Sequence, residues 1–391
     1  MRMSAEENGN GGRSVRLLTQ EEKQLTRPLY EEAFPEDGQK LTDYYYKIKM
    51  AGNEVFAALE STGHASGMLC LNPYRVMVRG KEYPLSYIVA VATEKAHRRE
   101  GVMRSVLTAA LRHLHSRSEA LRAENLPGIP FTFLKPADPA YYRPFGFSYI
   151  SRRTRRALKQ EAPVTREMFS RRNIPAAREV QALQETAAFM NAFLAARFEV
   201  YCYRDERYLQ ELLCEIEAGD GHLDLLYEKA ETGASGGLRI AGTAAYDYPG
   251  VPEDRTRLLT KEEYLAAAEA PAEPFLMARI VDLPAFLEML AGKNAAAFRF
   301  CFDDPLIPEN RGGWEIRAGS VARCSDKTDL PVFTPEQLEP LLFGYRTPGQ
   351  EAGTERNTDA ERDTDTERNA AEQLLLRTLR PIRGIYFDEE T

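Results

Sequence analysis

The strongest hydrophobic pattern of the chain lies between residues 85 and 114. Residues 85–93 form an almost continuous apolar run rich in β-branched side chains, which is typical of a strand buried on both faces of a sheet. Farther along, apolar side chains repeat with the spacing of one helix face. These positions are Met103, Val106, Leu107, Ala110, Leu111 and Leu114. The pattern predicts a buried strand, a short basic turn and an amphipathic helix in direct succession.

The remaining pattern divides the chain into three folded segments, and we predict an α/β (α+β) fold class. Residues 15–155 carry helices followed by several strands, residues 156–273 carry two helices and two strands, and residues 274–391 open a third mixed pattern. Residues 1–14 are polar, and we expect a flexible tail there. Residues 349–370 contain no large apolar side chain. Because such a segment cannot offset its ordering entropy, we predict a mobile loop.

Capping residues mark two helix starts in the third segment. Asp282 stands two residues before Pro284, as an N-cap followed by a proline in the first helical turn. Thr334 is followed three residues later by Gln337, which is the spacing of a capping box. Helices are therefore predicted to begin directly after Asp282 and Thr334.

Composition and charge argue against several classes of function. The net charge of −8 speaks against a nucleic-acid partner, which requires a basic face. No apolar run approaches the roughly 20 residues that span a bilayer, and the N-terminus lacks the apolar core of a secretory signal. The five cysteines are scattered without a Cys-x-x-Cys pair, so we expect reduced thiols and no metal. We predict a cytoplasmic protein with no membrane or nucleic-acid partner.

The basic turn between the predicted strand and helix has the features of an anion site. Arg98, Arg99 and Glu100 lead into Gly101, where the helix is expected to open. The first N–H groups of a helix have no intrahelical partner, and its positive end attracts anions. Gly101 allows an anion to approach the backbone, and the arginines add charge-assisted hydrogen bonds. A turn with a purely structural role is the alternative.

Residues 89–107 resemble motif A of the GNAT acetyltransferases. The general signature of that motif, Arg/Gln-x-x-Gly-x-Gly/Ala, falls on Arg98, Gly101 and Met103. Met103 departs from the small residue usual there, and Glu100 lowers the local positive charge. The resemblance implies that the turn binds the pyrophosphate of acetyl-CoA, the cosubstrate, and that the preceding strand pairs with its pantetheine arm. The implied cofactor-binding residues are Val91, Ala92, Thr93, Arg98, Arg99, Glu100, Gly101, Val102 and Met103.

Residues 141–147, Tyr-Tyr-Arg-Pro-Phe-Gly-Phe, resemble the Tyr-x-x-Phe-Gly-Phe/Tyr motif of many GNAT proteins, and of the enhanced intracellular survival (Eis) acetyltransferases in particular. The resemblance makes Tyr142 the catalytic acid, because the thiolate expelled by amine attack on a thioester needs a proton. A tyrosine with a pKa of about 10 is a weaker acid than a thiol near 8.5, so full transfer is uphill by roughly 2 kcal/mol. A hydrogen bond can still stabilise the developing thiolate. A tyrosine that only packs in the core is the alternative.

The three segments resemble the Eis organisation of a GNAT domain, a second degenerate GNAT-like domain and a C-terminal domain similar to a sterol carrier protein. In that family the terminal carboxylate enters the acetyltransferase pocket and helps to deprotonate or orient the amine. By resemblance this role falls on Thr391, although the acidic end of this chain differs from the more apolar ends of the family. A frayed tail is the alternative. The resemblance also implies a homo-oligomer, with a hexamer as the family's common state.

Phe34, Glu36 and Tyr45 are the candidate substrate-binding residues. They fall in the predicted helices that commonly form the wall of a GNAT acceptor pocket, and aromatic faces can hold cations. Core packing explains the aromatic residues equally well. We interpret His97, beside the basic turn, as a structural or phosphate-side residue rather than a general base.

The sequence thus predicts an acetyl-CoA-dependent N-acetyltransferase that acts on a primary amine in a ternary complex, without a metal. By family likeness, aminoglycosides and lysine side chains are the first substrates to test. Two alternatives stay open: a lipid or sterol carrier, and a catalytically silent regulator that binds acyl-CoA. The carrier would bind apolar ligands without consuming thioester, and the regulator would tolerate replacement of Tyr142.

Overall fold

The computed structural model describes residues 13–169, 176–229, 238–246, 256–268, 270–292, 297–350 and 359–389. Of the predicted flexible tail, residues 1–12 lie outside the described residues, and Ser14 already begins the first strand. Within the described residues, no helix combines the length and the apolar character that crossing a membrane requires.

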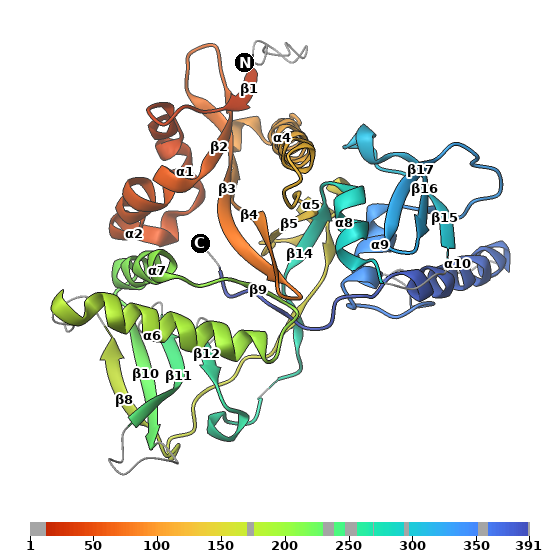
Figure 1. Ribbon diagram of the computed structural model, residues 1–391. Coiled ribbons are helices and arrows are strands. Elements are labelled where there is room, and N and C mark those ends of the chain that lie inside the picture. Colours follow the sequence, from red (N-terminus) through yellow and green to blue (C-terminus); the bar gives the residue numbers. More distant parts are fainter. Residues whose placement is uncertain are drawn as a thin grey trace.

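A nine-stranded mixed sheet forms the centre of the described structure (Figure 1). Its main path runs in the order β1-β2-β3-β4-β5-β14-β6, and β9 and β19 extend it at one end of β3. The strands are β1 (Ser14–Leu17), β2 (Glu54–Leu59), β3 (Ala65–Val78), β4 (Lys81–Thr93), β5 (Phe131–Leu134), β6 (Ser148–Tyr149), β9 (Val200–Cys202), β14 (Met277–Ile280) and β19 (Ile385–Tyr386).

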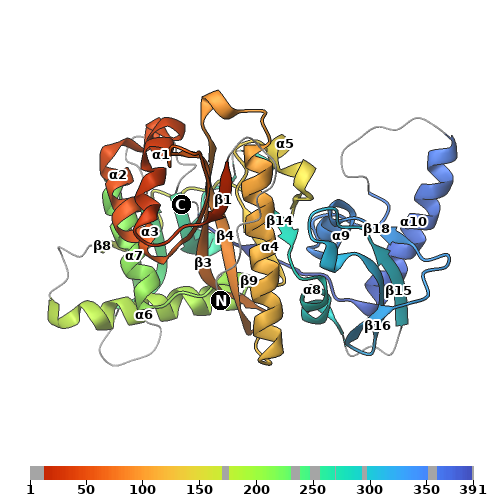
Figure 2. The same cartoon turned by 90° about the horizontal axis from the view of Figure 1, so that it is seen from above.

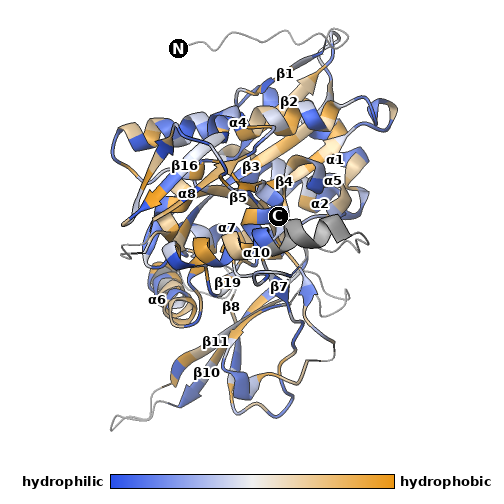
Figure 3. Ribbon diagram, turned by 90° about the vertical axis from the view of Figure 1, so that its right-hand side faces the viewer, coloured by the Kyte–Doolittle hydropathy of each residue, from blue (hydrophilic) through white to orange (hydrophobic). Residues whose placement is uncertain are grey.

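Helices cover both faces of this sheet (Figure 2). The amphipathic stripe predicted from the sequence lies on α4 (Val102–Ala123), which packs on β2 and β3. The opposite face is covered by α1 (Arg27–Ala33), α2 (Gly38–Tyr44), a π-helical turn (Tyr45–Lys49) and α3 (Met50–Gly52). Successive residues of β2 point into the cores on opposite faces of the sheet. Phe56 packs in the core on the α4 face, and Val55 packs in the core on the face covered by α1. In Figure 3 the hydrophobic colour follows the central strands, whereas α4 shows both colours.

A second unit carries its own antiparallel sheet with the strand order β12-β11-β10-β8. Helices α6 and α7 pack together and against this sheet, and their buried side chains form a separate core. The elements are β8 (Thr165–Phe169), α6 (Ala176–Ala195), α7 (Glu206–Ala218), β10 (His222–Lys229), β11 (Leu238–Tyr246) and β12 (Thr256–Thr260). The short strands β7 (Arg152–Arg153) and β13 (Glu273–Pro274) pair where the chain enters and leaves this unit.

The C-terminal part contains a four-stranded sheet in the order β17-β16-β15-β18, with helices beside it. Both predicted caps are present: Asp282 accepts a hydrogen bond from Ala285 N (3.0 Å), and Thr334 N donates to Gln337 Oε1 (2.9 Å). The elements are α8 (Leu283–Leu290), β15 (Ala297–Phe302), β16 (Gly312–Arg317), β17 (Ser320–Cys324), β18 (Val332–Phe333), α9 (Pro335–Leu342) and α10 (Asp359–Thr378).

The sequence pattern places a boundary at residue 274, but a strand from beyond this boundary lies in the central sheet. Strand β14 belongs to the third segment by sequence, yet it lies in the central sheet between β5 and β6. All four of its residues are buried. A strand with two buried faces needs partners on both edges, and those of β14 come from residues 131–149. The sequence pattern indicated the strand but contained no information on its partners.

The prediction of a mobile loop over residues 349–370 is wrong in part, because α10 begins at Asp359. Residues 351–358 lie outside the described residues. Helix α10 is anchored by contacts that a local pattern does not contain: Leu375 is buried in the main core, and Arg346 donates to both oxygens of Glu372 (2.9 and 2.6 Å). An anchored helix can extend through polar residues with good helix propensity, such as the Glu, Arg and Ala of this stretch.

Candidate active site

A bulge interrupts β4 where it pairs with β3. Between the pairs Met68↔Ala92 and Cys70↔Val89, β4 holds two residues opposite one residue of β3. Ala90, in this bulge, has the positive φ of 51° that marks a local distortion of the strand. The pair recorded between β4 and β5 lies before the bulge, at Tyr87↔Phe133. Because β5 ends at Leu134, the described residues give the second half of β4 no partner in β5, which leaves an edge where an extended ligand arm can pair with the backbone.

The predicted pantetheine-side residues lie along this edge. Ala92 and Thr93 pair with Met68 and Gly67 of β3 on the other side of the strand. Ala92 is buried, and Val91 and Thr93 are half-buried. Their backbone groups, rather than their small side chains, are suited to hold a ligand arm.

The basic turn exposes the N-terminus of α4. Arg98, Arg99, Glu100 and Gly101 are all exposed, and Arg99 and Gly101 have φ values of 68° and 81°. Gly101 is the N-cap and has no side chain, so the first N–H groups of α4 have no side-chain cap. The turn therefore presents backbone donors, a positive helix end and two guanidinium groups to one ligand.

The remaining residues of the motif A resemblance have different environments. Glu100 is engaged by His97 Nδ1 (3.0 Å) and Arg13 Nη2 (3.1 Å), which offsets its negative charge at the turn. Val102 is buried in the core that α4 shares with the sheet, so only its backbone N–H can serve a ligand. Met103 is half-buried and packs against the same core.

Tyr142 lies in a short helix, α5 (Pro139–Tyr142), that Asp138 caps by accepting from Ala140 N (2.8 Å). Its side chain is 7% exposed, and its ring packs edge-on against Phe147 at 5.8 Å between centroids. Burial raises the pKa of Tyr142 to about 12, so the phenol stays protonated at neutral pH and can donate a hydrogen bond. The neighbouring Tyr141 is exposed.

The turn and the tyrosine motif are brought together by a contact between α4 and the segment after α5. The guanidinium carbon of Arg104, in the first turn of α4, lies 5.1 Å from the centroid of the Phe145 ring. Phe145 is three residues from Tyr142 and belongs to the same core cluster. Two motifs that are about forty residues apart in the sequence thus meet at one end of α4.

Thr391, the predicted terminal carboxylate, lies outside the described residues. The chain leading to it is held firmly up to Glu389. The Phe387 ring stacks at 4.1 Å on Phe133, the residue of β5 that pairs with Tyr87 of β4. Arg204 donates to Asp388 Oδ1 (2.5 Å), and Tyr208 Oη donates to Glu389 Oε1 (2.8 Å). The C-terminal segment therefore lies beside β5, at the place where β5 pairs with β4.

The two acidic residues of this segment respond to burial in opposite ways. Burial, aided by the charge of Asp388, raises the pKa of Glu389 to about 7. Burial opposes ionisation of Asp388 as well, but the Arg204 guanidinium holds the pKa of Asp388 below its usual value. The segment is thus docked by one ion pair and one carboxyl group that titrates near neutrality.

We expect the free energy of unfolding to fall less with rising pH in Glu389→Gln than in the parent protein. The folded-state pKa of Glu389 lies above the value of an unfolded glutamate, so the folded form binds more protons between about pH 4.5 and pH 7. The stability that Glu389 contributes is therefore fully present below about pH 4.5 and is lost as the pH rises to about 7. Urea unfolding midpoints at about pH 5 and pH 8 measure the difference. The exposed Glu161→Gln is the control, and equal pH dependence of all three proteins contradicts the prediction.

Of the predicted substrate-binding residues, Phe34 and Tyr45 meet on the ring of Tyr30, at 4.9 and 5.0 Å between centroids, whereas Glu36 is exposed. Phe34 is half-buried and Glu36 is exposed, both near the end of α1. Tyr45 is buried among residues of α1 and the sheet, so its role in substrate binding stays a prediction. The neighbouring Tyr44 faces α7 instead, where its Oη donates to Glu211 O (3.2 Å). A helix covered twice buries consecutive aromatic residues.

Sequence reasoning missed the buried arginines that support the site. Arg279 of β14 is fully buried and donates to Phe145 O (2.8 Å), next to the tyrosine motif, and to Asp304 Oδ1 (2.5 Å). Arg204 anchors the C-terminal segment in the same way. An arginine inside an apolar run, as in the sequence around Arg279, is a signal that could have indicated a buried ion pair.

Comparisons with known proteins agree with this geometry. Residues 14–150 match the family model of an acetyltransferase (GNAT) domain, and residues 283–383 match that of a sterol carrier protein domain. The first match shows that the chain carries an acetyltransferase domain of the GNAT type. No curated protein is similar enough in sequence to match the chain.

Solved structures share the fold over nearly the whole chain. A probable N-acyltransferase from Enterococcus faecalis V583, described as a conserved protein of unknown function, superposes with a TM-score of 0.66 at 17% identity and covers 96% of this chain and 100% of its own. A GCN5-related N-acetyltransferase from Kribbella flavida gives 0.61 at 17% identity, with 97% and 99% covered. Eis1 from Mycobacterium abscessus gives 0.52 at 15% identity, with 86% and 90% covered. At these identities the likeness shows the fold.

Proposed function

We propose that this chain, through its GNAT domain, transfers an acetyl group from acetyl-CoA to a primary amine in a ternary complex. The observation that carries the proposal is the exposed N-terminus of α4, which has no side-chain cap. It follows the end of β4 that lies beyond the pair with β5, and its Arg104 contacts Phe145 in the segment after Tyr142. A coenzyme with a diphosphate, an extended amide arm and a reactive thioester needs these three features in this order.

The coenzyme is held mainly by backbone groups. Its diphosphate binds the N–H groups around Gly101, Val102 and Met103, with Arg98 and Arg99 adding charge. Its pantetheine arm pairs with β4 from Val91 to Thr93, beyond the pair of β4 with β5. This arrangement orients the thioester toward Tyr142.

The transfer is a direct substitution at the thioester carbon. The neutral amine attacks that carbon, the C–N bond forms and the C–S bond breaks as the electron pair leaves with sulfur. Tyr142 Oη donates a hydrogen bond to the developing thiolate, and the protonated state that its raised pKa secures is the one required. The proton lost by the amine passes to a carboxylate directly or through water, and coenzyme A leaves as a thiolate that takes up a proton from solvent.

For the amine proton we propose the terminal carboxylate of Thr391. The support is the docking of the preceding residues, since Phe387 stacks on β5 and Asp388 is bound by Arg204. Acceptors with several amines, of which aminoglycosides and peptide lysines are examples, are the first to test. A cytoplasmic homo-oligomer remains part of the proposal.

A thiol-release assay with acetyl-CoA and a panel of amines tests the function. Thiol release that depends on both substrates is expected, as is calorimetric binding of acetyl-CoA in the absence of an amine. Binding without release for every amine favours the silent regulator, and absence of binding overturns the proposal. A form extended beyond Thr391 is expected to lose about 100-fold in turnover, the typical contribution of a general base. Intact turnover of the extended form removes Thr391 from the mechanism.

We expect Gly101→Val to weaken acetyl-CoA binding by at least tenfold, about 1.4 kcal/mol. A β-branched side chain at φ 81° is strained, and it would project into the open space in front of the first amides of α4. Calorimetric titration with acetyl-CoA measures the effect. Gly80→Val is the matched control, because Gly80 has a φ of 80° and open space around its Cα but lies at the other end of β4. Equal affinities of the two variants contradict the prediction.

A further inference from the structure

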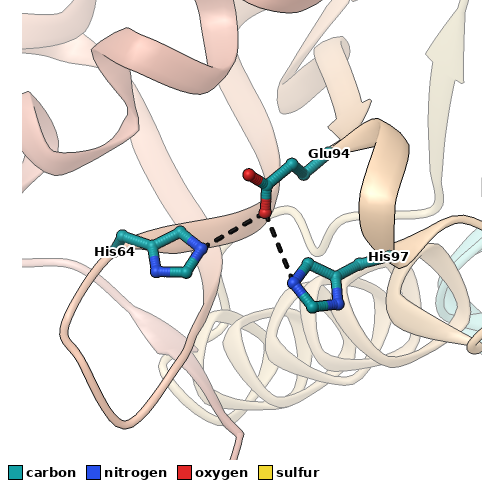
Figure 4. Close-up of side chains that lie close together, drawn as sticks. All are labelled: His64, Glu94 and His97. Atoms are coloured by element: carbon teal, nitrogen blue, oxygen red, sulfur yellow. Dashed lines mark hydrogen bonds and ion pairs between the residues drawn. The ribbon is translucent and has the colours of Figure 1, made fainter.

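Three side chains with metal-ligating atoms converge beside the basic turn, outside the proposed transfer chemistry. In Figure 4 the rings of His64 and His97 both point toward one oxygen of Glu94. His64 Nε2 lies 3.2 Å and His97 Nε2 lies 3.4 Å from Glu94 Oε2. One ligand atom from each residue lies within 4.8 Å of the other two.

The backbone fixes this arrangement from two separate parts of the chain. His64 lies in the turn between β2 and β3, whereas Glu94 directly follows β4 and His97 ends a 3-10 turn (Lys95–His97). Glu94 N donates to Ser66 O (2.9 Å), which continues the β3–β4 ladder up to the cluster. The three residues are therefore held together by sheet pairing and not only by their own contacts.

Each imidazole is oriented by a hydrogen bond at its other nitrogen. His64 Nδ1 lies 2.8 Å from Thr62 Oγ1, and His97 Nδ1 lies 3.0 Å from Glu100 Oε2. Arg13 Nη2 lies 3.1 Å from the same nitrogen of His97 and donates to the same oxygen of Glu100 (3.1 Å). In the tautomer that donates from Nδ1 to Thr62 or Glu100, Nε2 is free to ligate, which is the usual outer-shell arrangement of metal-binding histidines.

We propose that His64, Glu94 and His97 bind one divalent transition-metal ion of the zinc class. Zinc bonds of about 2.0–2.2 Å in a tetrahedron separate two ligand atoms by roughly 3.3 Å. The two measured separations, 3.2 and 3.4 Å, match this length. Two neutral imidazoles and one carboxylate suit such an ion, and water fills the fourth position. The partial exposure of the cluster gives the ion access from solvent.

The ion would connect the β2–β3 turn to the segment that leads into the N-terminus of α4. If it does so, it restrains the turn that holds the coenzyme diphosphate, and acetyl-CoA binding tightens when zinc is present. This consequence rests on the proposed function, but metal binding itself does not. The two are therefore measured separately.

The test is calorimetric titration of the full chain, stripped with a chelator, with zinc ion alone. We expect one ion per chain, and a loss of affinity of at least about 100-fold in His64→Ala, Glu94→Gln and His97→Ala. Thr62→Val, which removes only the orienting hydroxyl, is expected to cost about tenfold. His222→Ala is the matched control, because His222 is also a half-buried histidine beside a carboxylate, Asp224 (3.8 Å). Cobalt(II) should give the intense visible absorption of tetrahedral coordination in the parent protein.

Absence of zinc binding, or binding that the three ligand variants do not weaken relative to His222→Ala, overturns the proposal. In that case the cluster is a hydrogen-bonded group that only fixes the turn. Thermal melts of the zinc-free variants establish that they are folded. A protein that binds zinc but not acetyl-CoA would refute the proposed function and leave the metal site standing.

Discussion

Tyr142→Phe is expected to slow acetyl-CoA-dependent thiol release by about 10²–10⁴-fold, the range for loss of a general acid. The phenylalanine keeps the ring that packs on Phe147, so neither the fold nor the affinity for acetyl-CoA should change appreciably. Turnover is measured with the best amine of the panel, and coenzyme affinity by calorimetry. A loss in turnover without a loss in binding identifies an interaction made in the transition state.

Tyr141→Phe provides the matched control for this prediction. Tyr141 is the preceding residue of the same motif, but its side chain is 58% exposed, whereas that of Tyr142 is 7% exposed. It should retain parental turnover. If Tyr142→Phe also retains it, Tyr142 is a packing residue and another donor protonates the thiolate. If both variants are equally impaired, the motif acts through its structure and not through one hydroxyl.

Arg279→Ala is expected to lower the free energy of unfolding by about 3–5 kcal/mol, as when one partner of a buried ion pair is removed. The substitution leaves Asp304 and Glu339 buried without their cation. Arg279 holds the pKa of Asp304 below its usual value even though burial opposes it, whereas burial raises the pKa of Glu339 well above its usual range. The variant also loses the hydrogen bond to Phe145 O. Urea unfolding measures the change through the shift of its midpoint.

Arg299→Ala is the control for Arg279→Ala. Arg299 lies on β15 with its side chain 47% exposed, 3.6 Å from Asp326, and an exposed pair contributes at most about 1 kcal/mol. If Arg279→Ala does not fold, Arg279→Lys retains a cation and should show a smaller loss that can be measured. Equal midpoints for the Arg279 and Arg299 variants would contradict the role of this network. Because Arg279 contacts the segment after Tyr142, a folded Arg279 variant should also lose turnover.

Local patterns of the sequence predicted the parts of the fold that depend on neighbouring residues. The apolar run before residue 93, the turn at Gly101 and the stripe of α4 follow from side-chain periodicity and from the φ that glycine allows. The caps at Asp282 and Thr334 follow from side chains that bond to backbone groups three residues away. The same local logic placed the candidate coenzyme turn and Tyr142, because each motif lies within a few residues of chain.

Local patterns could not predict which distant segments meet. The pattern around Arg279 predicts a strand. The position of this strand depends on its partners β5 and β6, which lie more than a hundred residues earlier in the sequence. The polar half of α10 resembles a loop until its buried end is known, and the pattern around Tyr45 does not show that its ring packs on Tyr30.

By itself, the sequence determined the strand, turn and helix that form the candidate coenzyme site, and its resemblance to a GNAT motif made Tyr142 the candidate acid. Only the tertiary structure decided that Arg104 joins these motifs, that Arg279 supports them from the C-terminal half, and that His64 meets Glu94 and His97. The physical reason is that periodicity and capping act between near neighbours. Strand partners, buried ion pairs and ligand clusters instead depend on contacts between residues that are far apart in the sequence and that only the complete fold brings together.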